Sequence, residues 1–107
     1  MGLIRICDLE VAPPVGSLKE FKNDTLEVLV INVDRKYYCT GARCPHAGGA
    51  PLAEGSVEGI VLSCPWHGAQ FRVTDGKLLK GPAKENLIVY RTVVKDNQIF
   101  VEVNNEF

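Results

Sequence analysis

Two short stretches of similar pattern decide how this sequence is interpreted: "CPHAGGAPL" at residues 44–52 and "CPWHGAQF" at residues 64–71. Each begins with Cys-Pro, places a histidine within the next three residues, and continues through glycine into an apolar tail. The chain has 2 histidines in all, and both fall inside these stretches. The first question is therefore what these cysteines and histidines hold together.

The four side chains Cys44, His46, Cys64 and His67 have the composition of a metal-ligand set. Two thiolates and two imidazoles suit either tetrahedral zinc or an iron–sulfur centre. The flanking glycines and prolines favour the iron–sulfur centre, because such loops point backbone N–H groups at negatively charged sulfides. A zinc-stabilised structural or binding module with the same donors is the alternative of another class.

The rest of the chain predicts an all-β fold, because short β-branched apolar runs alternate with frequent turn signals. Turns are expected at Asn23-Asp24, Asp34-Arg35, Asp75-Gly76 and Asp96-Asn97, and one helical turn is expected within residues 8–17. We expect a β framework built from both chain ends, with a loop-rich insert between its halves. The candidate framework strands are residues 3–7, 18–21, 25–33, 36–40, 86–94 and 98–103.

Composition excludes several classes of function. The chain has 107 residues, 46% of them hydrophobic and 23% charged, with a formal net charge of −1. This balance gives no electrostatic reason to expect nucleic acid or an anionic membrane as a partner. The longest apolar segment, residues 26–33, is far shorter than the roughly 20 residues that span a bilayer. The N-terminal residues lack the pattern of a secretory signal, so we expect a cytoplasmic protein with reduced thiols.

The two loop motifs, together with "GSVEGIVL" before the second loop, "TDGK" after it and a closing pair of strands, resemble Rieske-type ferredoxins. The resemblance covers nearly the whole chain and is to the small ferredoxins of ring-hydroxylating dioxygenase systems and of archaea. It implies a single Rieske domain over residues 1–107, with an antiparallel sandwich or barrel-like framework. That framework would comprise residues 1–40 and 84–107, and a small cluster-binding subdomain would comprise about residues 41–83.

The resemblance also implies one [2Fe–2S] cluster as the cofactor. Carried over, Cys44 and Cys64 would hold the buried iron, and His46 and His67 would hold the outer iron. The family covers its cluster with a third loop that contains proline, and Pro82 in "KGPAKE" is the candidate. Cys7 and Cys39 lie in strand-like apolar runs, where cysteine usually serves as a small buried apolar residue.

Four neighbouring positions depart from the high-potential members of the family. Gly49 and Trp66 stand where respiratory members have disulfide cysteines, and Ala69 and Phe71 stand where those members have Ser and Tyr hydroxyl donors. A donor to a cluster sulfur stabilises the more negative, reduced state, so its loss lowers the potential. We therefore expect a potential toward the low end of the Rieske range of roughly −150 to +300 mV. Trp66 is expected to shield the cluster, with partner docking as the alternative.

The expected function is that of a one-electron carrier and not of an enzyme. A mononuclear iron oxygenase needs two further histidines and a carboxylate, and both histidines of this chain are already assigned. The resemblance implies an NAD(P)H- or flavin-dependent ferredoxin reductase and a terminal oxygenase, or another acceptor, as partners. These would dock transiently near His46 and His67. A small Rieske subunit of a larger reductase or respiratory complex is the alternative within the same chemistry.

Overall fold

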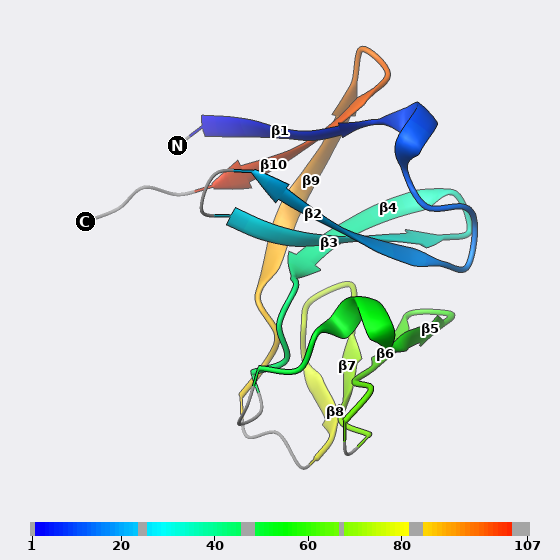
Figure 1. Ribbon diagram of the computed structural model, residues 1–107, viewed down its shortest axis with the longest axis vertical. Coiled ribbons are helices and arrows are strands. Elements are labelled where there is room, and N and C mark those ends of the chain that lie inside the picture. Colours follow the sequence, from blue (N-terminus) through cyan, green and yellow to red (C-terminus); the bar gives the residue numbers. More distant parts are fainter. Residues whose placement is uncertain (1, 24–25, 46–48, 67, 82–84, 104–107) are drawn as a thin grey trace.

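A computed structural model describes residues 2–23, 26–45, 49–66, 68–81 and 85–103. Among these residues, the helical segments are two 3-10 turns, η1 (Leu9–Val11) and η2 (Leu52–Glu54). The strands form a six-stranded and a four-stranded sheet, both antiparallel, which confirms the predicted all-β class. The two sheets occupy the upper and lower parts of Figure 1. No helix among the described residues is long and apolar enough to cross a membrane.

The six-stranded sheet is built from both ends of the chain, as expected from the sequence. Its two edge strands approach each other, and the Asn23 side-chain amide donates to the Arg5 carbonyl oxygen at 2.9 Å. This contact joins the two edges of the curled sheet. In spatial order the strands are β1 (Gly2–Asp8), β10 (Gln98–Val103), β9 (Val89–Lys95), β4 (Lys36–Gly41), β3 (Leu26–Val33) and β2 (Leu18–Asn23).

Two tight hairpins of this sheet fall where the sequence predicts them. Asp34 and Arg35 have φ values of 51° and 74°, and Asp96 and Asn97 have φ values of 52° and 59°. Consecutive residues with positive φ are the signature of the type I′ turn, whose twist matches that of the paired strands. The turn after Asn23 involves Asp24 and Thr25, which lie outside the described residues.

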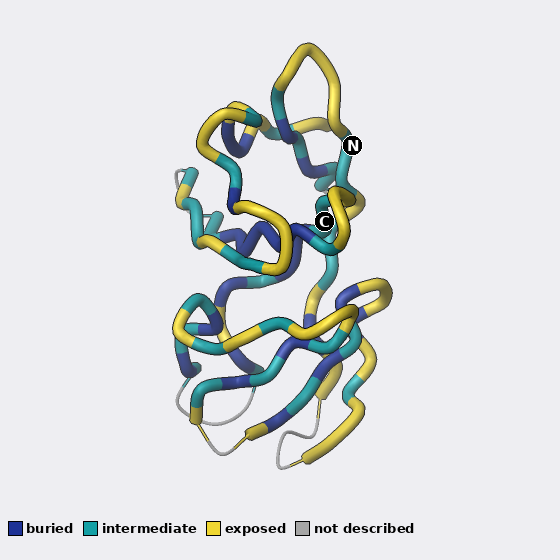
Figure 2. Tube along the Cα trace, turned by 90° about the vertical axis from the view of Figure 1, so that its right-hand side faces the viewer, coloured by how far each residue is buried: buried dark blue, intermediate teal, exposed yellow. Residues whose placement is uncertain are grey.

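Strand β3 is buried on both faces and separates two hydrophobic cores. Its residues Leu29 and Ile31 belong to the core shared with the four-stranded sheet. Val28 and Val30, which point to the other face, belong to the core inside the curled sheet. Figure 2 shows the buried segments running through both parts of the molecule. Burial on both faces explains why this strand is a nearly continuous apolar run and not an alternating one.

The four-stranded sheet belongs to the loop-rich middle of the chain. It contains β5 (Ser56–Glu58), β6 (Val61–Ser63), β7 (Gln70–Arg72) and β8 (Leu78–Lys80), paired in that order. Its strands are short, and its buried residues Leu62 and Phe71 face the same core as Leu29 of β3. The predicted hairpin turn at Asp75-Gly76 joins β7 to β8, through residues 73–77.

The strand predicted over residues 86–94 is wrong at its beginning, because β9 starts only at Val89. Residues 86–88, which we call the connector, lie outside β9 and bond to two other segments. The Leu87 N–H donates to the Gly76 carbonyl at 2.8 Å, and the Gly41 N–H donates to the Ile88 carbonyl at 2.9 Å. The connector therefore ties the β7–β8 turn to the end of β4.

Asn32 fixes a loop within the six-stranded part of the molecule. Its side chain is buried, and its Nδ2 donates to the Pro13 carbonyl at 3.0 Å. Its Oδ1 accepts from the Arg35 N–H at 2.9 Å. One side chain thus joins the Pro-rich loop before β2 to the β3–β4 turn.

Gly76 tests how much the connector depends on close backbone packing. Its φ is +77°, and a Cβ there would collide with the Leu87 carbonyl oxygen and lie 2.8 Å from Val89 Cγ2. We expect Gly76→Ala to lower the free energy of unfolding by about 2–4 kcal/mol, since it adds backbone strain to overpacking. Urea unfolding followed by circular dichroism measures this change.

Gly16→Ala is the matched control, because Gly16 has a φ of +79° and nothing within 4 Å of its would-be Cβ. In Gly16→Ala only the strain of an alanine at positive φ lowers the stability, by about 1 kcal/mol. Equal losses of stability in the two variants would contradict the close contact with Leu87.

Candidate metal centre

The two cysteine loops are closed in the same way. In the first loop, residues 44–50, the Cys44 N–H donates to the Ala50 carbonyl at 2.9 Å. In the second loop, residues 64–69, the Cys64 N–H donates to the Ala69 carbonyl at 2.7 Å. In each case the residue before the alanine is a glycine with positive φ. The two stretches that are similar in sequence are therefore also closed by the same kind of backbone hydrogen bond.

Each loop is the tip of a short hairpin. Arg43 and Pro51 form an isolated antiparallel bridge just outside the first loop, and Ser63 pairs with Gln70 just outside the second. Each cysteine is thus the first residue after the last pair of its hairpin. The described parts of both loops lie at the lower end of Figure 1, away from the six-stranded sheet.

Both loop cysteines are buried in one core. Cys44 is 3% exposed and Cys64 is 4% exposed, and both belong to the core shared between the two sheets. Cys7 and Cys39 belong to the other core, inside the curled sheet. The prediction that Cys7 and Cys39 are small buried residues is confirmed, and a site of all four cysteines is incompatible with this separation.

The environment of Cys39 is apolar, and burial raises the pKa of its thiol to about 11. Burial also raises the pKa of the Cys7 thiol. Thiols of raised pKa remain protonated near neutral pH and are poor nucleophiles and poor metal ligands.

The structure places only part of the predicted set of site residues. His46, His67 and Pro82 lie outside the described residues, so their positions stay predictions. Within the described ranges no group of three or more His, Cys, Asp and Glu side chains is gathered as a metal site. The described neighbours of the cysteines are Gly49, with positive φ, the buried Ala69 and Phe71, and Trp66, which is 44% exposed.

The described residues fit the cysteine half of an iron–sulfur ligand set. Two thiols start two equivalent loops and share one water-poor core, which suits soft thiolate ligation of a buried iron. The tight turns at Gly49 and Gly68 allow each loop to fold back over a short distance. Zinc would accept the same thiols, so the described geometry by itself leaves the metal open.

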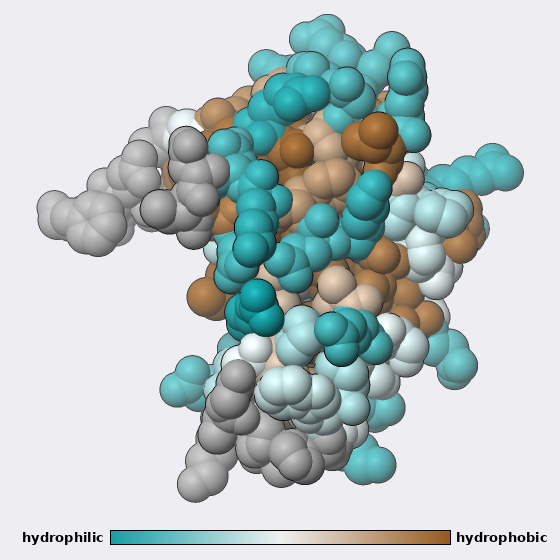
Figure 3. Space-filling model, in the orientation of Figure 1, coloured by the Kyte–Doolittle hydropathy of each residue, from teal (hydrophilic) through white to brown (hydrophobic). Residues whose placement is uncertain are grey.

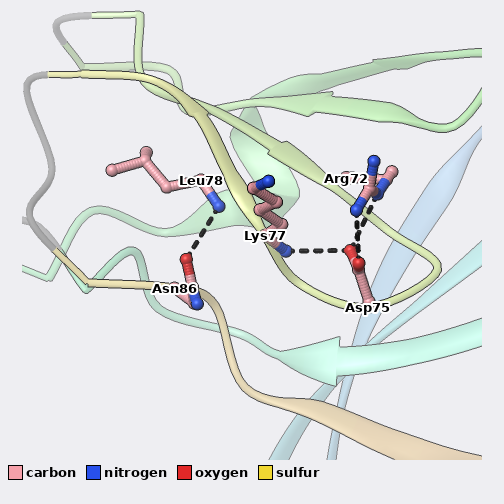
Figure 4. A network of polar contacts seen from close by, with 5 residues as sticks. All are labelled: Arg72, Asp75, Lys77, Leu78 and Asn86. Atoms are coloured by element: carbon pink, nitrogen blue, oxygen red, sulfur yellow. Dashed lines mark hydrogen bonds and ion pairs between the residues drawn. The ribbon is translucent and has the colours of Figure 1, made fainter.

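The sequence analysis missed a polar network in the turn after β7, at the opposite end of this strand from the second loop (Figure 4). The Arg72 Nε donates to Asp75 Oδ1 at 2.9 Å, its Nη2 donates to Oδ2, and the Lys77 N–H also donates to Oδ1, at 3.0 Å. These bonds lower the pKa of Asp75 to about 2. They fix the turn between β7 and β8.

The same figure shows Asn86 of the connector, whose Oδ1 accepts the Leu78 N–H of β8 at 2.9 Å. The sequence analysis assigned Asn86 to a strand and gave it no role. Two features of the sequence could have placed Asn86 outside the strand. Asparagine is depleted in strands, and Asn86 closely follows the turn-forming pair Gly81-Pro82.

A cavity of about 240 Å³ lies between the first loop and the connector. It is lined by Cys44 and Pro45 of the first loop and by the chain from Glu85 to Ile88. This cavity brings the connector to the immediate surroundings of a candidate ligand.

Comparison with known proteins gives a consistent result. The family model described as "Rieske [2Fe-2S] domain" matches residues 5–94. A 3-phenylpropionate/cinnamic acid dioxygenase ferredoxin subunit of Photorhabdus laumondii is 33% identical over 99% of each chain. A chain in the complex of reduced oxygenase and oxidised ferredoxin of carbazole 1,9a-dioxygenase is 29% identical, with a TM-score of 0.82 over 92% of this chain and 91% of that one. The Sphingomonas yanoikuyae B1 ferredoxin shares the fold, with a TM-score of 0.87, 23% identity, and coverage of 96% and 100%.

The separation of the cysteines into two cores predicts which Cys→Ala variants lose iron and which retain it. We expect Cys44→Ala and Cys64→Ala to lose nearly all iron and acid-labile sulfide, because each removes a thiolate that nothing replaces. Cys7→Ala and Cys39→Ala remove thiols from the other core and should retain the full complement. Iron and sulfide assays, with circular dichroism to verify folding, make this comparison. Iron loss in a folded Cys7 or Cys39 variant would contradict the assignment.

The raised pKa of Cys39 predicts a loss of stability in alkali. The Cys39 thiol ionises near pH 9 in the unfolded chain and near pH 11 in the folded protein. The protonated thiol therefore stabilises the folded state fully below about pH 9. This stabilisation is lost as the pH rises through 11, by about 2–3 kcal/mol. Urea unfolding at about pH 8 and about pH 11 measures it. Cys39→Ala should show a smaller decrease between these pH values, and an unchanged decrease would count against the buried thiol as its cause.

Proposed function

This chain belongs to the Rieske [2Fe-2S] domain family, and we propose that it carries single electrons from a reductase to a terminal oxygenase. Its cofactor is one Rieske-type [2Fe–2S] cluster. The chain is an electron-transfer protein and not itself an enzyme, in keeping with relatives named as ferredoxin subunits of dioxygenases. The observation that carries the proposal is the pair of equivalent loops that place Cys44 and Cys64 in one core.

The proposed ligands are two on each loop. Cys44 and Cys64 would hold the buried iron, and His46 and His67 would hold the outer one. When bound, the cluster accepts and releases one electron without any change in the ligands. The protein contributes thiolates, imidazoles, backbone N–H groups and a water-poor surround. The sheet topology supports residues of about 41–83 as the cluster-binding subdomain on the framework of residues 1–40 and 84–107.

The predicted potential is toward the low end of the Rieske range. Ala69 and Phe71 belong to the same core as Cys64, are fully buried, and have side chains without a hydrogen-bond donor. A reduced cluster beside them lacks the stabilisation that hydroxyl donors would supply. Gly49 and Trp66 exclude a disulfide between the two loops at those positions.

Partner docking near His46 and His67 is supported by exposed apolar residues beside the two loop cysteines, Trp66 on the second loop and Ile88 on the connector. Trp66 is 44% exposed and Ile88 is 64% exposed, so apolar area is available beside the charged residues. The exposure of Trp66 favours a docking role over shielding alone. In Figure 3, described residues in the lower middle of this face are pale, of intermediate hydropathy. A small surface of this kind suits the weak, short-lived contacts of redox partners.

An NAD(P)H- or flavin-dependent reductase is the proposed donor, and the cytoplasmic location stays a prediction.

Protein-film voltammetry between about pH 6 and about pH 11 tests the proposal. We expect a reversible one-electron wave toward the low end of the roughly −150 to +300 mV range, falling at alkaline pH as the histidine ligands lose protons. A colourless protein that contains zinc would reject the electron-transfer function. A potential hundreds of millivolts higher would favour the respiratory-type subunit.

Two variants test the cause of the low potential within the same experiment. Ala69→Ser and Phe71→Tyr each add a hydroxyl donor, and each should raise the potential by on the order of tens of millivolts. Unchanged potentials in both folded, cluster-loaded variants would show that these positions do not reach the cluster sulfurs.

A further inference from the structure

Asn86 closes a chain segment that begins at β8. Its side chain accepts the Leu78 N–H at 2.9 Å, so residues 78 and 86 are held together across the intervening segment. At the start of this segment Lys80 pairs with Gln70, the residue directly after the second loop. The closed segment therefore leaves the sheet beside the second cysteine loop and returns beside β8.

The position of Leu78 is itself fixed by the turn that precedes it. Arg72 and Asp75 bond in a two-point contact, the Lys77 N–H donates to Asp75, and the Gly76 N–H donates to the Arg72 carbonyl at 2.6 Å. Asn86 is thus anchored to the rigid end of a hairpin (Figure 4).

The connector that carries Asn86 also faces the first cysteine loop. Asn86 and Glu85 line the cavity of about 240 Å³ together with Cys44 and Pro45 of the first loop. Leu87, the next residue, is buried in the same core as Cys44 and Cys64. Movement of the connector would therefore change how closely water approaches Cys44.

We propose that Asn86 is a positioning residue for the cluster: its bond to Leu78 holds the connector against the first loop and limits the access of water to Cys44. This inference rests on the proposed function, because it concerns the surroundings of a proposed ligand. Asn86 acts through the backbone that it anchors, and no direct contact with the cluster is required.

The proposal has a definite sign. The reduced cluster carries one more negative charge than the oxidised cluster, so water near its thiolates stabilises the reduced form more. Releasing the connector should therefore raise the reduction potential. It should also let chelators and water reach the cluster sooner.

The first variant is Asn86→Ala, which removes the acceptor. Hydrogen exchange at the Leu78 amide should become faster, which verifies that the bond is lost. The potential should shift upward, and the loss of visible absorbance in the presence of a chelator such as EDTA should be severalfold faster than in the parent protein.

The second variant is Asn86→Asp, which keeps an acceptor oxygen of the same reach and adds a negative charge. The Leu78 amide should stay protected, and the rate of cluster loss should stay near that of the parent. The potential should shift downward, because the added charge disfavours the reduced state. Shifts of the reduction potential in opposite directions in the two variants distinguish the effect of losing the bond to Leu78 from the effect of an added charge.

Asn32→Ala is the matched control. Asn32 also joins a loop to a turn through its amide, but its contacts, Pro13 and Arg35, belong to the six-stranded part. It should lower stability without shifting the potential.

An unchanged potential and an unchanged rate of cluster loss in Asn86→Ala, with Leu78 exchange accelerated, would overturn the proposal. An equal upward shift in Asn32→Ala would also overturn it, since the effect would then be one of stability alone. Absence of any cluster in the parent protein would instead reject the proposed function.

Discussion

The two-sided burial of β3 is the constraint on which the rest of this structure depends. Leu29 and Ile31 pack toward the four-stranded sheet, while Val28 and Val30 pack into the curled sheet. Because side chains alternate along a strand, a shift of register by one residue would exchange the two sets and leave both cores misfilled. One strand therefore fixes how the subdomain that carries the cysteine loops sits on its framework. The Asn32 side chain, at the end of the same strand, extends this constraint to the preceding loop.

The equivalence of the two cysteine loops follows from backbone chemistry more than from sequence identity. Each loop satisfies its cysteine N–H by an alanine carbonyl, and each needs a glycine with positive φ to bring that carbonyl back. The cysteine N–H is thereby used within the loop. Two such hairpin tips, arranged on one core, bring two thiols together without a helix or a long strand to support either of them.

The sequence predicted the framework well because its strands are read from local signals. The turns at Asp34-Arg35 and Asp96-Asn97 and the strands on either side of them depend on neighbouring residues alone. The same reasoning failed at the connector, where an apolar run resembled the start of a strand. Its partners, Gly76 and Gly41, are distant in sequence, and the side chain of Asn86 bonds β8 instead of extending β9. The short strand β5 was not predicted, because it is defined by its pairing with β6 and not by composition. Of the candidate site, the choice of Cys44 and Cys64 as ligands followed from the pattern, whereas their burial and their separation from Cys7 and Cys39 required the tertiary structure.

The connector explains how a small protein keeps a redox site in fixed surroundings although the loops that hold it are irregular. Loops at the end of short hairpins have few contacts of their own and depend on adjacent segments for rigidity. Here one three-residue stretch bonds to the end of β4 before the first loop and to the turn after β7, beyond the second loop. Its middle residue, Leu87, packs among the cysteines, and no Cβ fits at Gly76, where the backbones meet. The relative position of the two loops is thus set by a segment that belongs to neither, so residues outside the ligand motifs determine the environment in which the ligands act.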